Sequence, residues 1–302
     1  MVRRDFLRLA GLAAGLATLG EAGAASKRPA LGLQLFTVLL DLERDFEGTL
    51  ATVSKLGYRE VETIGAFGRD PKDVRAALRR HGLSSPSQHL VPGTLYDAFR
   101  KFTARQLSFD EVKALWLEQM SLARVKPTIE EAVQRAHAIG QQHIVWQIIW
   151  KEQMTDRAAL DSFCAAMNEA GRICAREGLT FNFHNHSDEF TPVDGVVPYD
   201  YILANTDPGT VKLELDSYWV VNAGKDPVAY LGAHAGRYVQ CHLKDRAANG
   251  DFATVGQGTV DFAALLAAAR ASGVKHFYVE YDRSDDPMRA VREAADYLER
   301  WF

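Results

Sequence analysis

The stretch LTFNFHNHSDEF, residues 179–190, gathers histidines, asparagines and acidic residues behind a short apolar alternation. Imidazole is a common metal ligand and carries protons near neutral pH. Alternate residues of a strand point to one side, so Asn182, His184 and His186 are expected to share a face. The plainer interpretation is a hydrogen-bonded polar corner without chemistry, because buried polar groups must be paired in any case.

Comparable side chains lie at the ends of other strand-like runs. Asp216 ends VKLELD, His242 lies late in YVQCHL, and Glu280 lies late in HFYVEYD. Carboxylates crowded at one point repel each other, and a divalent cation removes that cost. An Asp/His/Glu set therefore predicts a mixed oxygen and nitrogen site for Mn²⁺, Zn²⁺, Co²⁺, Fe²⁺ or Mg²⁺. Glu62 and His89 end two earlier runs.

Short β-rich runs alternate with helical runs along the chain after residue 30. Such alternation implies parallel strands, because each crossover needs a helix. Eight units fit a single-domain α/β fold over 30–302, a (β/α)8 TIM barrel with its functional groups at the carboxyl ends of the strands. A doubly wound sheet is the alternative, but GxGxxG and GxxxxGK[ST] motifs are absent. The runs are 31–36, 59–65, 83–90, 142–149, 179–185, 211–216, 238–243 and 276–282.

Segment 94–126 is too long for a plain connection and predicts an inserted lid or helix over the barrel mouth. It is also the candidate interface of a homo-oligomer. Thr128 and Glu131 form a T-x-x-E pattern, which predicts a capping box at the start of the next helix. The Asp226-Pro227 and Asp286-Pro287 pairs predict two further helix starts.

The first 25 residues have the pattern of a cleavable twin-arginine signal peptide. Arg3 and Arg4 precede an apolar stretch at 9–19 and a small-residue site at 22–24. The apolar stretch is shorter than the roughly 20 residues that a membrane anchor needs. We therefore expect export by the twin-arginine machinery, a periplasmic protein, and no membrane attachment after cleavage.

Composition excludes several other classes. The 302 residues carry a formal net charge of −4 and no basic field, so nucleic acid is a poor partner. The three cysteines form no CxxC pair, which argues against a disulfide framework or a cysteine-based zinc site.

Motifs spread over the mature chain carry a family resemblance. They are LGLQLFTV, GYREVETIGAFG, FHNHSDEF, LELDSYWVVNAGKDP, HLKD, VGQGTVDF and YVEYD. Together they resemble the xylose isomerase-like TIM barrel superfamily, especially the sugar phosphate isomerase/epimerase proteins. In ketose 3-epimerases of that superfamily, Glu, Asp, His and Glu on strands five to eight hold the metal, and the two glutamates exchange protons with the substrate. Asp216, His242 and Glu280 match the last three ligands.

The fifth-strand ligand departs from that pattern. The resemblance places the expected glutamate at Asn182, whose neutral amide is a weak ligand and no base. His184 is the nearest substitute, as fourth ligand or as second acid/base. His186 and Glu189 are expected to contact substrate hydroxyls or to orient His184.

The remaining mouth residues have two interpretations each. Trp219 could stack on a sugar ring or pack against a loop. Lys244 could hold a substrate oxyanion or pair with Asp245. Gly256 and Gly258 could let backbone amides approach a ligand, or could simply form a turn. The expected substrate-binding set is Glu62, His89, His186, Glu189, Trp219 and Lys244.

The leading functional hypothesis is a metal-dependent sugar isomerase or epimerase. The cation would polarise a carbonyl and stabilise the enediolate that forms when Glu280 removes a neighbouring proton, and His184 would return the proton. The alternative is a lyase, dehydratase or deglycosidase acting on 3-keto sugars or 3-keto glycosides, which a single catalytic glutamate and a periplasmic location favour. An endonuclease-IV-like phosphodiesterase would need more ligands and a basic surface. A non-catalytic sugar-binding barrel would not need metal.

Overall fold

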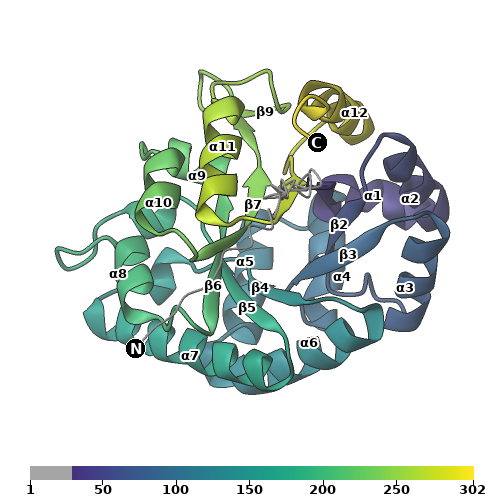
Figure 1. The fold of residues 1–302 in the computed structure, drawn as a ribbon. Helices are drawn as coiled ribbons and strands as arrows, with labels where there is room; N and C mark the ends of the chain where they lie inside the picture. Colours follow the sequence, from purple (N-terminus) through teal and green to yellow (C-terminus); the bar gives the residue numbers. More distant parts are fainter. Residues whose placement is uncertain (1–28) are drawn as a thin grey trace, which may run out of the picture.

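The computed structural model describes residues 29–302 (Figure 1). The predicted signal peptide at residues 1–25 lies outside the described residues, and so does the expectation of export that depends on it. Within the described residues, no helix is both long and apolar enough to cross a bilayer.

Eight parallel strands close into a barrel, in the order β1-β10-β7-β6-β5-β4-β3-β2 (Figure 1). Closure is complete because β1 pairs with both β2 and β10. Every predicted strand is present, and β6 and β7 have the predicted bounds. The strands are β1 Leu31–Gln34, β2 Glu60–Ile64, β3 Ser84–His89, β4 His143–Trp146, β5 Thr180–His184, β6 Val211–Asp216, β7 Tyr238–Leu243 and β10 His276–Val279.

Helices follow each strand and surround the barrel, which confirms the predicted (β/α)8 fold. The α-helices are α1 Leu39–Arg44, α2 Phe46–Lys55, α3 Pro71–Arg80, α4 Gly93–Thr103, α5 Phe109–Gln119, α6 Val125–Ile139, α7 Arg157–Arg176, α8 Pro198–Asn205, α9 Ser217–Asn222, α10 Pro227–Ala233, α11 Phe262–Ser272 and α12 Pro287–Leu298. Short 3-10 turns are η1 Leu35–Val38, η2 Leu122–Arg124, η3 Lys151–Gln153 and η4 Asp188–Phe190, and β8 Asp245–Arg246 pairs with β9 Phe252–Ala253 in a small hairpin.

Local capping chemistry explains several helix starts. Helices α10 and α12 begin at the predicted Asp-Pro pairs, and in each the aspartate accepts a backbone N–H of the first turn. The capping box predicted at Thr128 is wrong. Because η2 leads straight into α6, that helix already begins at Val125, and Thr128 lies inside it. Helix α5 carries a capping box instead, formed by Ser108 and Glu111.

Strand β6 divides its side chains between an apolar outer face and a polar barrel interior. In β6, Leu213 and Leu215 are fully buried among the core residues, and the alternate residues Glu214 and Asp216 are fully buried within the polar cluster described below. The interior is also tightly closed where β1 meets β10. A Cβ on Gly32 would lie 2.6 Å from the carbonyl oxygen of Phe277, so only glycine fits there. The strands thus present a polar interior to the barrel mouth.

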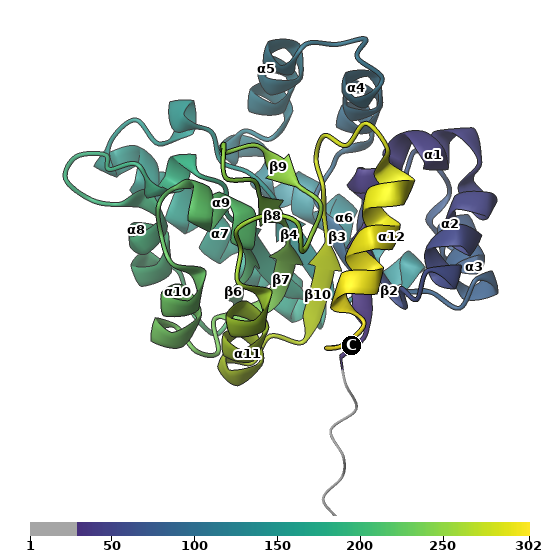
Figure 2. The same cartoon turned by 90° about the horizontal axis from the view of Figure 1, so that it is seen from above.

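The long segment after β3 is helical, as predicted. Helices α4 and α5 stand beyond the arrowhead ends of the strands in Figure 2, on the side of the barrel where the β8–β9 hairpin also lies. An edge-to-face contact between Phe99 and Trp116, with ring centroids 6.0 Å apart, packs α4 against α5. Phe36 at the end of β1 contacts Phe99 at 6.2 Å. The pair is therefore anchored to the mouth, and its roles as lid and interface stay predictions.

Candidate active site

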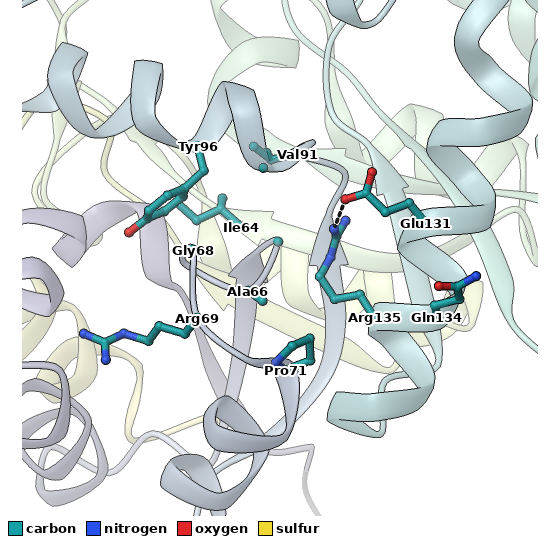
Figure 3. A pocket seen from close by; sticks show the side chains of 12 residues that line it. Ile64, Ala66, Gly68, Arg69, Pro71, Val91, Tyr96, Glu131, Gln134 and Arg135 are labelled. Atoms are coloured by element: carbon teal, nitrogen blue, oxygen red, sulfur yellow. Dashed lines mark hydrogen bonds and ion pairs between the residues drawn. The ribbon is translucent and has the colours of Figure 1, made fainter.

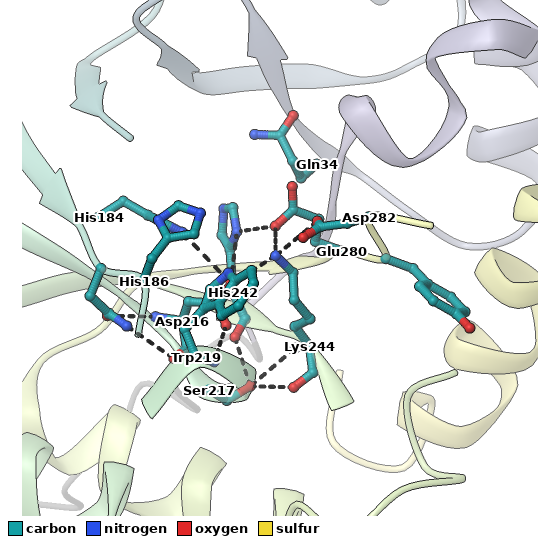
Figure 4. A network of polar contacts seen from close by, with 12 residues as sticks. Gln34, His184, His186, Asp216, Ser217, Trp219, His242, Lys244, Glu280 and Asp282 are labelled. Atoms are coloured by element: carbon teal, nitrogen blue, oxygen red, sulfur yellow. Dashed lines mark hydrogen bonds and ion pairs between the residues drawn. The ribbon is translucent and has the colours of Figure 1, made fainter. Parts of the chain in front are cut away.

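Asp216, His242 and Glu280 meet at the carboxyl ends of β6, β7 and β10 (Figure 4). Nδ1 of His242 lies 2.8 Å from Oε2 of Glu280 and 3.9 Å from Oδ2 of Asp216. One potential ligand atom from each residue lies within 4.8 Å of the other two. We call these residues the outer trio, and the structure brings them together as the sequence predicted.

The ammonium group of Lys244 lies against two members of the outer trio. Its Nζ is 2.6 Å from Oε2 of Glu280, 3.0 Å from Oδ2 of Asp216 and 2.9 Å from Oδ1 of Asp282. The side chain is only 2% exposed. Lys244 is therefore a buried cation held by three carboxylates.

Asp245 does not pair with Lys244, which corrects one of the two sequence interpretations. Its carboxylate instead accepts backbone N–H groups of Gly256 at 2.9 Å, Gly258 at 2.8 Å and Val260 at 3.1 Å. A Cβ on Gly258 would lie 2.3 Å from Oδ1 of Asp245, which accounts for glycine at that position. The two glycines thus form a loop closed around Asp245, and their amides are already bonded.

A second set of histidines lies behind the outer trio. His89 Nε2 and His184 Nδ1 are each 3.0 Å from Oε2 of Glu214, and His242 Nε2 is 3.4 Å from the same oxygen. These four residues also offer ligand atoms within 4.8 Å of one another, and we call them the inner group. His242 belongs to both sets, one ring nitrogen facing each. His184 belongs to the inner group, although its Nε2 lies 3.7 Å from Asp216.

Glu62 is fully buried and its two oxygens are occupied. Oε2 lies 2.7 Å from His242 Nε2 and accepts the side-chain N–H of Gln34 at 2.7 Å, while Oε1 accepts the hydroxyl of Ser87 at 2.5 Å. His89 is 3.2 Å from the same Oε2. Glu62 and His89, which were predicted to bind substrate, are therefore bonded to other residues of the cluster. Glu62 holds His242 directly, and His89 does so through Glu62.

Asn182 lies inside the barrel, farther from the mouth than a metal ligand at the carboxyl end of β5 would lie. Its Nδ2 is 3.3 Å from Nδ1 of His143 and donates to the carbonyl oxygen of Thr180 at 3.2 Å. Asn182 lies two positions before His184, which ends β5. The Asn182 amide nitrogen is bonded to His143 and Thr180 instead of to Asp216, His242 or Glu280, so the fifth-strand ligand of the resembled pattern has no counterpart there.

The loop after β5 carries His186 and Glu189. Both carboxylate oxygens of Glu189 accept the backbone N–H of His186, at 3.1 and 3.2 Å, and the side chain is fully buried. Glu189 therefore shapes the loop that carries His186. The His186 ring lies 4.9 Å from the Trp219 ring. His186 Nδ1 and Trp219 Nε1 are buried without a hydrogen-bond partner among the described residues, so each is free to bond to a ligand.

Opposite charges control the ionisation of the outer trio. Burial alone would raise the pKa of Glu280, but the charges of Lys244 and His242 hold that pKa well below its ordinary value. Burial would lower the pKa of His242, yet Glu214 and Glu280 raise it well above the ordinary value. The pKa of Lys244 is likewise raised, against burial, by its three carboxylate partners. Glu280 is thus an ionised carboxylate, and His242 and Lys244 are cations.

The ionisable groups next to the outer trio also have shifted pKa values, some raised and some lowered. Burial opposes but does not prevent a rise in the pKa of His89 to about 9, caused by Glu62 and Glu214. Burial, with Glu280 nearby, raises the pKa of Asp282 to about 6. Burial also lowers the pKa of His184 and, with the charge of His184, lowers that of His186 well below the ordinary value. His184 and His186 are therefore neutral near pH 7.

The cluster holds more negative than positive charge. Its carboxylates are Glu62, Glu214, Asp216, Glu280 and Asp282, and its cations are His89, His242 and Lys244. Two negative charges are therefore left inside the barrel. In addition, Oε1 of Glu214 is buried without a hydrogen-bond partner among the described residues. A surplus of two negative charges beside imidazole and carboxylate oxygens fits one divalent cation.

Sequence reasoning missed four members of this cluster: Gln34, Ser87, Glu214 and Asp282. Ser87, Glu214 and Asp282 each lie two positions from a predicted site residue, on the same face of the predicted strand. Gln34 lies in the first predicted strand. Glu214 precedes Asp216 by two in VKLELD, and Asp282 follows Glu280 by two. Period-two alternation along the selected strands would have found both.

A surface hollow lies beside the barrel mouth, beyond the ends of β2 and β3 (Figure 3). Its volume is about 330 Å³, and none of the cluster residues lines it. Arg135, which donates to Glu131 and Gln88, forms one wall. The hollow is thus separate from the chemistry of the barrel interior. Its lining residues include Ile64, Gly65, Arg69, Val91, Tyr96 and Arg135.

Comparisons with known proteins agree with this fold and site. A family model described as "Xylose isomerase-like TIM barrel" matches residues 50–301. The chain is 30% identical over 266 residues to an inosose dehydratase of Lactiplantibacillus plantarum, covering 82% of this chain and 84% of that protein. It is 27% identical over 278 residues to an inosose dehydratase of Geobacillus kaustophilus, covering 83% and 85%.

A solved structure of a sugar phosphate isomerase/epimerase from Parabacteroides distasonis is also similar. It is 26% identical, with a TM-score of 0.73, and the match covers 90% of this chain and 98% of that one. The closed parallel barrel, with a buried His/Asp/Glu cluster at the carboxyl ends of its strands, agrees with these matches. The chain belongs to the xylose isomerase-like TIM barrel family.

Proposed function

We propose that the protein is a metal-dependent carbon–oxygen lyase that acts on a keto sugar or a 3-keto glycoside. The observation that carries the proposal is the asymmetry of the site. Glu280 is an ionised carboxylate on one side of His242, while His184 and His186, which lie on the other side of His242 in Figure 4, are held neutral. The similarity to proteins named inosose dehydratase supports this choice.

Asp216, His242 and Glu280 would hold the cation, because their ligand atoms converge inside a negatively charged cluster. His242 is protonated without metal and would release its Nδ1 proton on binding the cation. Glu62 fixes the orientation of His242 through Nε2 and leaves Nδ1 toward the outer trio. A cation bound there would draw electrons from a substrate carbonyl and so acidify the neighbouring C–H bond.

Glu280 would take the proton from the carbon beside the carbonyl. The electron pair left behind forms a carbon–carbon double bond as the bond from the next carbon to its oxygen breaks. Glu280 then returns its proton to the departing oxygen, which leaves as water or as an alcohol. The Lys244 ammonium, which is also paired with Asp282 at the barrel mouth, would stabilise negative charge on that oxygen. One base is therefore sufficient for elimination.

Other residues would bind and orient the sugar. His186 Nδ1 and Trp219 Nε1 are buried polar atoms without a partner in the described chain, and they suit hydroxyl groups of a substrate. The Trp219 ring offers an apolar face for a sugar ring. Glu189 would act indirectly, by holding the backbone of His186.

The test is product analysis with metal-loaded protein. We expect conversion of an inosose or a 3-keto glycoside into an unsaturated ketone, with release of water or aglycone detected by NMR. Glu280→Gln should lower turnover by about 100-fold or more, because it removes the general base. Glu293→Gln, a surface control, should retain activity. Full activity of Glu280→Gln, or an epimerised product, would contradict the lyase proposal.

Isomerase or epimerase chemistry is the second candidate. It is favoured by the similarity to a protein called sugar phosphate isomerase/epimerase and by the position of His184, 3.7 Å from Asp216. Epimerisation needs a proton donor on the opposite face of the substrate, and a neutral imidazole is a poor donor. Proton exchange from D₂O with retention of all oxygens would identify this reaction.

Export to the periplasm by the twin-arginine machinery is part of the proposal. It depends on Arg3, Arg4 and the apolar stretch that follows them. Replacement of both arginines by lysine should keep the protein in the cytoplasmic fraction, while the unchanged chain is found in the periplasm in a shorter, cleaved form. Equal distribution of the two proteins would contradict export by this route.

A further inference from the structure

Lys244 and a divalent cation would bind the same carboxylate oxygens. Oδ2 of Asp216 and Oε2 of Glu280 belong to the outer trio, and both lie within 3.0 Å of the Lys244 ammonium. The ammonium and a divalent cation are both positive, and each is attracted to the same carboxylate oxygens. An ammonium and a divalent cation therefore compete for these two oxygens.

A third carboxylate offers the ammonium a place to go. Asp282 lies 2.9 Å from Lys244 Nζ, and it does not belong to either set of potential ligands. Its side chain is 21% exposed, whereas those of Asp216 and Glu280 are 0% and 7% exposed. Asp282 thus stands nearest to solvent among the three partners of Lys244.

The surroundings of Lys244 suit a cation that moves outward. Its Nζ lies 5.6 Å from the Trp219 ring and 5.9 Å from the Phe252 ring, both of which attract positive charge. The flexible four-carbon stem of lysine allows the ammonium to shift while its backbone stays fixed. The backbone of Lys244 is anchored by its N–H and C=O, which both bond to the hydroxyl of Ser217.

We propose that Lys244 is an exchangeable internal counter-ion of the metal site and that Asp282 is its alternative partner. Before metal binds, the ammonium neutralises Asp216 and Glu280. When a divalent cation takes these oxygens, the ammonium stays paired with Asp282 at the mouth. Asp282 is then a positioning residue that acts on metal affinity only through Lys244. This inference rests on the metal site of the proposed function, and it concerns affinity rather than the reaction.

Mn²⁺ binding to metal-free protein, measured by calorimetry at one fixed pH, tests the proposal. Lys244→Gln removes the competing charge and should tighten binding. Asp282→Asn removes the alternative partner and should weaken binding by about 10-fold to 100-fold, as other outer residues of metal sites do. Asp285→Asn, an exposed carboxylate in the same loop, is the control and should leave the affinity unchanged.

The double variant separates this proposal from simpler ones. If Asp282 acts through Lys244, Lys244→Gln/Asp282→Asn should bind Mn²⁺ as Lys244→Gln does. A loss caused by Asp282→Asn that persists in the Lys244→Gln background would make Asp282 a ligand and overturn the proposal. Unchanged affinity of Asp282→Asn would overturn it as well, and that variant answers the question even if Lys244→Gln does not fold. Absence of Mn²⁺ binding by the wild-type chain would instead reject the metal site itself.

Discussion

At the residue scale, His242 organises the whole cluster. One ring nitrogen faces Glu280 and Asp216, and the other faces Glu62 and Glu214. Carboxylates on both sides keep the ring protonated without metal and fix its orientation. The sequence predicted His242 as a ligand, but it did not predict that a second carboxylate shell lies behind it.

Glu189 gives a pH-dependent prediction at this scale. Burial raises its folded-state pKa to about 8, above its ordinary value of 4.5, so the folded chain binds this proton more tightly than the unfolded chain does. The stability from that proton is complete below pH 4.5 and is lost as pH rises through 8. The loss is on the order of a few kcal/mol. The free energy of unfolding in urea, measured from pH 5 to pH 9, should show it.

Two variants isolate the contribution of Glu189. Glu189→Gln should make the free energy of unfolding less dependent on pH over that range, because the ionisable group is gone. Asp188→Asn removes an exposed charge that contributes to the raised pKa of Glu189, so it should keep the pH dependence and shift it only slightly toward lower pH. A difference between wild type and Glu189→Gln that stays constant with pH would show that the buried carboxyl does not titrate as described.

The sequence predicted which side chains lie together at the strand ends, but it did not predict their hydrogen-bond partners. Asp216, His242 and Glu280 end three successive strands, and a parallel barrel brings such positions together. His89 ends β3, whereas Glu62 lies in the middle of β2 and not at its end as the sequence predicted. Their nitrogen and oxygen atoms are occupied by Gln34, Ser87, Glu214 and His242. Those bonds join strands that are distant in sequence, so no local pattern could reveal them.

At the element scale, the loop between β7 and α11 is held by one side chain. The Asp245 carboxylate accepts four backbone N–H groups of that loop, from Arg246, Gly256, Gly258 and Val260. Gly258 leaves the space for this carboxylate. Asp245→Asn places an N–H₂ group against backbone donors and should cost about 1–3 kcal/mol of unfolding free energy. Urea denaturation of the variant checks the value.

Asp251→Asn provides the matched control for that loop. Asp251 lies in the same connection, but it is exposed and accepts only a side-chain N–H of Asn249. It should change the free energy of unfolding by less than about 0.5 kcal/mol, as surface substitutions usually do. Equal effects of the two variants would contradict the structural role of Asp245.

The elements themselves were largely predictable, with one informative error. The eight strands are short runs bounded by turn residues, and Asp-Pro pairs start α10 and α12. The T-x-x-E pattern at Thr128 was misleading because η2 leads directly into α6 three residues earlier. Capping motifs show that a helix can begin at a residue, but the preceding turn decides whether it does.

At the scale of the whole molecule, the barrel puts charge where apolar residues usually fill the interior. The interior contains carboxylates on β2, β6 and β10 and histidines on β3, β5 and β7. The balance of two negative charges follows only from the closed ring of strands, because the sequence does not show which charges pair. The predicted fold is therefore confirmed, and the outer trio converges at the barrel mouth, while its role as a metal site stays a prediction. The contacts of the inner group and of Lys244 required coordinates.

The most direct test of the account is the metal content of the folded protein. We expect elemental analysis of protein loaded with Mn²⁺ and freed of excess ion to show about one divalent ion per chain, since the charge surplus fits one such ion. Asp216→Asn should lose the ion yet stay folded, because its remaining side-chain oxygen can still accept the N–H of Trp219 at the start of α9. A folded wild-type chain that retains no divalent ion, or an Asp216→Asn variant that retains it fully, would contradict the account.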